Sequence, residues 1–191
     1  MSKKVKSHVK KTTDVDWKYI MEKAFEKMPN WWPRAYLAAL ALVNFRGKAR
    51  PAMLRIVAEK QGIAYRTILR GLNRLIDENL VMRRDNEYVL KEEAHAIIVT
   101  MLKIMDEFNK EAELILSSEE SIKKLEAYYD QIKIFRDKSV ALLEKAHIKS
   151  EFLENLFSFI RYYIAESLEH LAYLKRTAKL IKEISTRGAR T

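Results

Sequence analysis

The chain contains no cysteine, and glycine and proline are scarce, with four Gly and three Pro among 191 residues. The absence of cysteine excludes disulfide bonds, a zinc site with cysteine ligands and a thiol nucleophile. So few Gly and Pro argue against an all-β fold, which needs many turns, and favour long helices. No apolar run reaches the roughly 18 residues of a membrane span, and no apolar signal core follows the Lys-rich N-terminus. We therefore expect a soluble, cytoplasmic protein with a mainly α fold.

Positive charge is concentrated in the first 90 residues. Residues 1–30 carry 8 Lys and Arg against 4 Asp and Glu, residues 31–90 carry 11 against 5, and residues 91–191 carry 17 against 17. The first two regions therefore hold all of the net charge of +10. A basic half joined to a neutral half indicates that one half meets a polyanion while the other has a different task.

Residues 1–13 form a polar tail that contains too little apolar surface to fold alone. Such a Lys-rich sequence is typical either of a solvated terminus or of a flexible arm that lies along phosphates. The cations that would contact phosphates in the second case are Lys3, Lys4 and Lys6. The rest of the chain is assigned to two domains, residues 14–90 and residues 91–187.

The first domain begins with a series of short helices. Apolar residues recur at helical spacing in four segments, and turn residues separate them at Pro29-Asn30, Arg46-Gly47-Lys48 and Gln61-Gly62. This pattern predicts helices at 14–28, from about Pro33 to Phe45, at 52–60 and at 64–79. The first of these is an extra N-terminal helix that Asp14 or Asp16 can cap.

Two short apolar runs close the first domain. The run at 80–84 and the run at 88–90 contain Val and Tyr, which favour strands, and the polar segment Asp85-Asn86-Glu87 between them favours a turn. The pattern predicts a small β-hairpin. Arg83 and Arg84 lie on it, where the hairpin of a DNA-binding domain often meets phosphate or the minor groove.

Residues 56–75 have the pattern of a helix-turn-helix. Ala58 is small enough to let a second helix cross closely, and Gly62 permits a positive φ in the tight turn. Three apolar side chains hold the two helices together, namely Ile63, Ile68 and Leu72. The remaining positions of the second helix then face outward, and they are Tyr65, Arg66, Arg70, Asn73 and Arg74.

These outward side chains suit recognition of double-stranded DNA. Arg donates in a fork to guanine and Asn pairs with adenine in the major groove, and residues near the start of the second helix usually reach the bases. The side chains that we expect to read bases are Tyr65, Arg66 and Arg70, with Asn73 on the same face. Thr67 either contacts a phosphate or caps the helix locally, and we expect Arg74 to contact the DNA backbone.

Residues 35–95 resemble the winged-helix transcription regulators of archaea and bacteria, in the broad MarR/PadR/ArsR-like group. The resemblance rests on the Gly62-Ile63 turn, the Leu72-x-x-Leu75 stripe and the segment 77–81 before a basic hairpin. It implies a winged helix-turn-helix that binds DNA in transcription regulation, and it covers about a third of the chain. Two departures are Ala64, where Ser or Thr often caps the recognition helix, and Asn79, where Gly is common.

Residues 91–187 contain neither Gly nor Pro, which predicts three long helices at 92–116, 119–147 and 150–186. Helices of this length form an antiparallel bundle or a coiled coil. Such a half typically holds two subunits together, so we expect a homodimer whose recognition helices read half-sites one DNA turn, about 34 Å, apart. The alternative is that all three helices pack within one chain and leave a monomer.

The last helix is rich in aromatic residues, which are Phe152, Phe157, Phe159, Tyr162, Tyr163 and Tyr173. Such a stripe is more typical of a core than of an effector pocket between helices. Glu166 and His170 are four residues apart, a spacing that we attribute to a surface ion pair rather than to metal ligands. The chain has no Gly-rich phosphate loop, HExxH motif or G-x-S-x-G motif. We therefore expect no enzyme activity, cofactor or metal.

The leading hypothesis from these patterns is a sequence-specific, dimeric transcription regulator. One alternative is an architectural or DNA-segregation protein with little sequence preference, and another is a winged-helix adaptor that binds another protein. The outward Arg and Asn side chains favour base reading, whereas the Lys-rich tail would serve a coating protein equally well. An adaptor would not need the difference in charge between the two halves.

Overall fold

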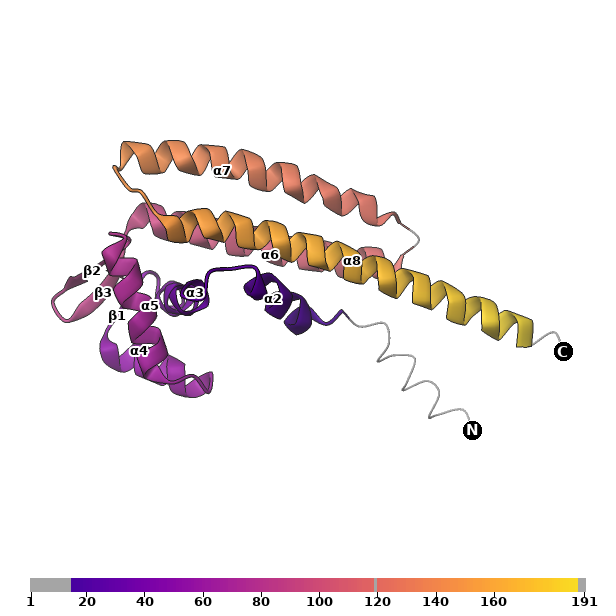
Figure 1. The fold of residues 1–191 in the computed structure, drawn as a ribbon, viewed down its shortest axis with the longest axis horizontal. Helices are drawn as coiled ribbons and strands as arrows, with labels where there is room; N and C mark the ends of the chain where they lie inside the picture. Colours follow the sequence, from indigo (N-terminus) through magenta and orange to yellow (C-terminus); the bar gives the residue numbers. More distant parts are fainter. Residues whose placement is uncertain (1–14, 119, 189–191) are drawn as a thin grey trace.

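Helices make up most of the chain, and a small antiparallel sheet lies at one end (Figure 1). This computed structural model describes residues 15–118 and 120–188. The mainly α fold is as predicted. The elements are, in chain order, α2 (Trp17–Glu26), α3 (Trp32–Val43), β1 (Lys48–Ala49), α4 (Pro51–Lys60), α5 (Tyr65–Asp77), β2 (Val81–Arg84), β3 (Glu87–Leu90), α6 (Glu92–Ser117), η1 (Ile122–Glu126), α7 (Ala127–Lys145) and α8 (Glu151–Gly188).

The sheet joins β1, β3 and β2 in that order, and both pairs are antiparallel. The predicted hairpin is present, and its turn residues Asp85 and Asn86 have φ angles of 46° and 62°. Both values are positive, as a two-residue type I′ turn requires. The strand β1 was not predicted, because Lys48 was assigned to a turn, whereas it pairs with Val89. A two-residue strand is too short to show alternation, and its existence depends on pairing with a distant segment.

Short helices α4 and α5 are joined by a tight turn at Gly62, whose φ angle is 65°. The positive φ predicted at Gly62 is therefore present, and glycine adopts it without a steric penalty. Ala58 on α4 is fully buried, in agreement with the close crossing expected there. At the other end of α5, Asn79 has a φ angle of 58°, a conformation that Asn tolerates better than most residues.

Helices α3 and α5 cross closely at Gly71. A Cβ atom added to Gly71 would lie 2.1 Å from the backbone oxygen of Arg34 and 2.8 Å from the Cβ of Ala38. No side chain fits between two helices at that distance. Gly71 therefore sets how deeply α5 packs on α3, a role that the sequence pattern did not single out.

Helix α2 packs against α8, although it precedes the short helices in the chain. Asp16, one of the two predicted caps, accepts a hydrogen bond of 3.0 Å from the backbone N–H of Tyr19. The ring of Phe25 lies 4.9 Å from that of Phe159 on α8, measured between centroids. The extra N-terminal helix therefore packs mainly on the long helix α8, while Phe25 also contacts Trp32 and Tyr36 of the short helix α3.

A single hydrophobic core runs through both predicted domains. Trp32 of α3 is fully buried, and its indole N–H donates a 3.0 Å hydrogen bond to the backbone oxygen of Phe152 at the start of α8. The ring of Trp32 also stacks on Phe152, with centroids 5.7 Å apart. The boundary expected at residue 90 therefore does not divide the molecule into two independent cores.

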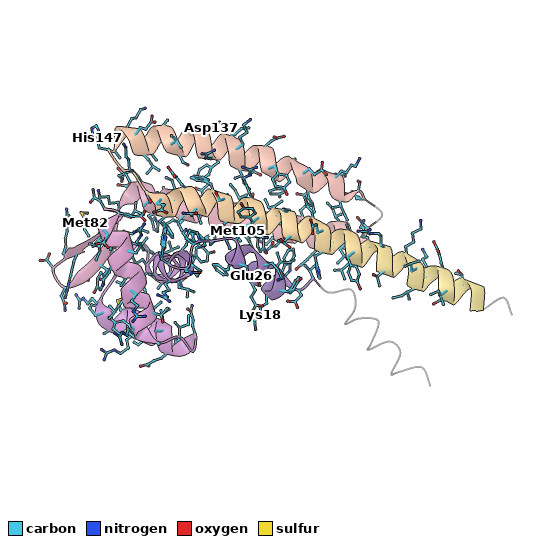
Figure 2. All side chains as sticks on the ribbon, in the orientation of Figure 1. Lys18, Glu26, Met82, Met105, Asp137 and His147 are labelled. Atoms are coloured by element: carbon cyan, nitrogen blue, oxygen red, sulfur yellow. The ribbon has the colours of Figure 1, made fainter. Side chains whose placement is uncertain are left out.

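The three long helices pack against one another within the chain, and the direction reverses from α6 to α7 and again to α8 (Figure 1). The predicted ranges agree to within a few residues, except that the second begins as the short 3₁₀ helix η1. Met105 of α6 is buried, and Figure 2 shows Asp137 of α7 on the outside. Four of the aromatic residues of α8 lie in this core: Phe152, Phe157, Phe159 and Tyr163.

Candidate nucleic-acid interface

One face of α5 is buried and the opposite face is polar. Ile68, Leu72 and Leu75 are fully buried, because they share the side of the helix that meets α3. The polar face consists of exposed residues separated by four, three and four positions, which places them on one stripe. They are Arg66, Arg70, Asn73 and Asp77.

Three of the four residues on this stripe were predicted to lie there. Arg66 and Arg70 are predicted base readers, and Asn73 lies on the same predicted face. Asp77 was not predicted, although its spacing from Asn73 places it there. Thr67 is half-buried on the flank of the stripe. The stripe therefore presents two guanidinium groups and one amide near the start and middle of α5, with a carboxylate at its end.

Tyr65 lies where α4, α5 and the hairpin meet. It is half-buried, and the guanidinium carbon of Arg55 on α4 lies 5.2 Å above the centre of its ring. Burial raises the pKa of the Tyr65 phenol above its ordinary value, and nearby Tyr88 adds to this, while Arg55 and Arg83 oppose it. The phenol therefore remains protonated near neutral pH and can donate a hydrogen bond.

Arg55 is a cation of this surface that sequence reasoning missed. It is exposed on α4, and its contact with Tyr65 holds it beside the start of α5. A cation–π contact at an exposed site contributes roughly 0.5–1 kcal/mol of attraction. Arg55 is the single Arg of α4, but nothing in the neighbouring sequence indicates that it lies next to the outer face of α5.

The hairpin adds two further exposed cations, Arg83 and Arg84. The guanidinium carbon of Arg83 lies 5.8 Å from the ring centre of Tyr88, its partner across the hairpin. Arg50 is engaged differently, because its Nε lies 3.1 Å from a carboxylate oxygen of Glu87. Arg83 and Arg84 therefore contribute positive charge beside α5, while that of Arg50 is largely balanced.

The start of α5 has no side-chain cap. Its N-cap residue is Ala64, which makes no capping hydrogen bond. The backbone N–H of Thr67 donates to the Ala64 oxygen at 2.8 Å. The N–H groups of the first positions of the helix have no side-chain partner. Free N–H groups at a helix start carry partial positive charge and bind phosphate. The departure from the usual Ser or Thr therefore makes this end more suited to an anion.

Arg74 is turned away from the exposed stripe of α5, although the sequence predicts that it contacts the DNA backbone. Its Nε lies 3.0 Å from Glu78, and it donates a 2.6 Å hydrogen bond to Glu151 at the start of α8. Its guanidinium carbon lies 4.2 Å from the ring centre of Trp31. The reason is geometric: Arg74 lies one turn beyond Arg70 but is rotated toward α8, where two carboxylates and an indole ring hold it.

Glu78 and Ser150 complete a junction between α5 and α8. The Glu78 carboxylate accepts hydrogen bonds of 2.7 Å from the Ser150 hydroxyl and 2.8 Å from the backbone N–H of Phe152. The Ser150 hydroxyl in turn accepts one from the N–H of Leu153. These bonds cap the start of α8, where a negative charge is favoured by the helix dipole. The orientation of α5 is therefore tied directly to that of α8.

The remaining site predictions fall outside this surface. Lys3, Lys4 and Lys6 lie outside the described residues. Within the described part of the chain, no group of three or more His, Asp or Glu side chains could hold a metal ion. No helix described here is long and apolar enough to cross a membrane.

Comparison with known proteins adds no assignment, because no family model, no curated protein and no solved structure matches the chain.

Proposed function

We propose that residues 32–90 form a winged helix-turn-helix and bind double-stranded DNA through α5. The order of elements supports this, since helix α3, strand β1, helices α4 and α5 and the hairpin β2–β3 follow one another as in that fold. The observation that carries the proposal is the outer face of α5, where Arg66, Arg70 and Asn73 are exposed opposite a fully buried apolar face.

In the proposed complex, α5 lies in the major groove. Arg66 and Arg70 donate paired hydrogen bonds to guanine, and Asn73 pairs with adenine. The Tyr65 phenol donates a hydrogen bond to the DNA at the start of the helix. The free N–H groups of that first turn bind a phosphate, and Arg55, Arg83 and Arg84 neutralise phosphates on either side.

The junction between α5 and α8 supports a role as a dimeric transcription regulator. Arg74 and Glu78 tie the recognition helix to the first turn of α8, so whatever fixes α8 also fixes the direction of α5. Two copies joined through their long helices hold two recognition helices at a set separation. Two linked sites bind far more tightly than one, because the second binding event becomes intramolecular.

The test compares two double variants that each remove two positive charges. R66A/R70A removes cations from the outer face of α5, and K133A/K138A removes two exposed Lys from α7. Affinities for a duplex selected by the wild-type protein are measured by fluorescence anisotropy at about 50 and 200 mM salt.

We expect R66A/R70A to lose affinity by roughly 1–3 kcal/mol for each Arg, while K133A/K138A stays close to wild type. Equal losses in the two variants would mean that total charge alone matters, and α5 would lose its assigned role. An architectural protein would show the loss in R66A/R70A to the same extent on every duplex sequence.

A further inference from the structure

Helix α8 continues past the end of the other long helices. The Lys175 ammonium group donates hydrogen bonds to the backbone oxygens of Ser118 and Glu120, at the end of α6. Beyond that point, residues 176–188 extend α8 by about 20 Å at 1.5 Å per residue, clear of the other helices (Figure 1). We name this segment, residues 176–188, the α8 extension. An isolated helical segment of this length is only marginally stable in water.

The outer face of α8 carries four exposed apolar side chains, and exposed Glu169 and Arg176 lie between them on the same side. The exposed fractions are 44% for Tyr162, 61% for Tyr173, 57% for Leu180 and 70% for Ile184. Intervals of 11 and 7 residues return to nearly the same side of a helix, so these four side chains form one stripe. They are four of the eleven large apolar side chains that are exposed in the described part of the chain.

Two of the four side chains are placed symmetrically about a third, Tyr173. Tyr162 and Ile184 are each 11 residues from Tyr173. If a second α8 runs antiparallel across the first with a two-fold axis at Tyr173, Ile184 of each copy meets Tyr162 of the other. A two-fold interface uses the same patch on both subunits, and Tyr162, Tyr173 and Ile184 meet this requirement. Leu180 lies opposite Glu166 of the other copy.

Charge selects the antiparallel arrangement. Residues 174–188 carry five Lys and Arg against one Glu, a net charge of +4, whereas residues 159–172 carry Arg161 against Glu166 and Glu169, a net charge of −1. Antiparallel pairing places the basic extension of each copy on the acidic segment of the other. Parallel pairing would place the two basic extensions side by side, and like charges at an interface are unfavourable.

We propose that the stripe Tyr162–Tyr173–Leu180–Ile184 is the dimer interface, occupied by α8 of a second copy in antiparallel orientation about Tyr173. Glu151, which contacts Arg74 of α5, precedes Tyr173 by 22 residues. The two Glu151 residues are then 44 residues of helix apart, or about 66 Å at 1.5 Å per residue.

This separation specifies the DNA target. Two turns of B-DNA measure about 68 Å, so the dimer reads half-sites two turns apart instead of the single turn expected from the sequence. The predicted spacing of the half-sites rests on the proposed DNA binding, whereas the proposed interface does not.

The interface is tested by disulfide trapping, because the natural chain has no cysteine. Full-length Y162C, I184C and Y173C are oxidised separately, and Y162C is also oxidised in an equimolar mixture with I184C. L114C, at a 69% exposed position on α6, is the control for random collision. Covalent dimers in every sample are measured on a denaturing gel.

We expect a covalent dimer from Y173C and from the mixture of Y162C with I184C, and little from L114C or from either of Y162C and I184C alone. Dimers from Y162C and I184C separately, with none added by mixing, would overturn the antiparallel arrangement. A monomer in solution by light scattering, with no trapping above L114C, would overturn the interface.

The DNA spacing is tested with the trapped Y173C dimer on duplexes that carry two selected half-sites at one-turn and two-turn separations. We expect at least tenfold tighter binding at two turns. A preference for one turn would overturn the predicted separation. Efficient trapping with no binding to any duplex would contradict the proposed function but not the interface. DNA binding without trapping would contradict the interface but not the proposed function.

Discussion

Helices α5 and α8 are both buried along one face and exposed along the other, yet their exposed faces differ in kind. The outer face of α5 carries Arg66, Arg70 and Asn73, and no large apolar side chain. The outer face of α8 carries Tyr162, Tyr173 and Ile184, and each is more than 40% exposed. A polar cationic face is stable in water and attracts a polyanion. An apolar stripe gains free energy when another protein surface covers it.

The comparison shows why the charge of a whole region is a coarse guide to function. Residues 91–191 are neutral as a whole, but this average combines a basic α8 extension with acidic segments before it. The basic charge of the first 90 residues is likewise divided, because Arg74 is used within the fold while Arg66 and Arg70 face solvent. Position on the folded surface, rather than the sum, distinguishes a DNA contact from a structural one.

The largest expected effect comes from placing charge on the outer face of α8. L180E/I184E introduces two carboxylates into the proposed interface, where they are buried without partners. We expect the variant to be monomeric by light scattering and to lose roughly 100-fold to 10,000-fold in affinity for a duplex with two half-sites. L114E is the matched control, and an unchanged dimer in L180E/I184E would place the subunit contact elsewhere.

A smaller effect is expected on the outer face of α5. Arg70→Ala should lower affinity for the selected DNA by about 1–3 kcal/mol and relax the preference at one base pair. Competition with duplexes that differ at single positions measures this preference. If affinity for selected and random duplexes falls equally, Arg70 contacts phosphate and does not read a base.

Arg74 lies on α5 but, unlike Arg70, is held by carboxylates within the fold. Arg74→Ala leaves the carboxylate of Glu78, which is 9% exposed, without its ion-pair partner. Since an unpaired buried acceptor is costly, we expect the free energy of unfolding to fall by about 1 kcal/mol, with the slope of affinity against salt unchanged. Urea denaturation and a salt titration measure the two quantities. A reduced salt slope would show that Arg74 contacts a DNA phosphate.

The smallest effect is expected from the N-terminal tail, whose residues lie outside the described structure. Replacement of Lys3, Lys4 and Lys6 by Ala should reduce the slope of log affinity against log salt by up to about 0.9 for each phosphate that these side chains neutralise. Sequence preference should not change. A slope identical to that of the wild-type protein would assign no DNA contact to the tail.

Much of the fold was predictable because helices depend on local patterns. The apolar spacing, the Gly62 turn and the Asp85-Asn86 turn are all encoded within a few residues, and the observed elements follow them closely. Strand β1 was missed because it exists only through pairing with β3. The position of α2 was missed for a related reason, since its partner α8 lies far away in the chain.

The candidate site was predictable in part. Periodicity places Arg66, Arg70 and Asn73 on one face, but it does not show which neighbours approach the flanks of that face. Arg74 was therefore assigned to DNA, although Glu78 and Glu151 hold it within the fold. Arg55 was overlooked because only the folded chain brings α4 against Tyr65.

The most direct test of the central claim is selection from a random-sequence duplex pool, with the bound fraction sequenced at about 50 and 200 mM salt. We expect enrichment of an inverted repeat whose half-sites are two turns, about 20 base pairs, apart, and loss of that enrichment in R66A/R70A. No binding at the lower salt concentration, or binding without any enriched sequence, would contradict the claim that α5 reads DNA.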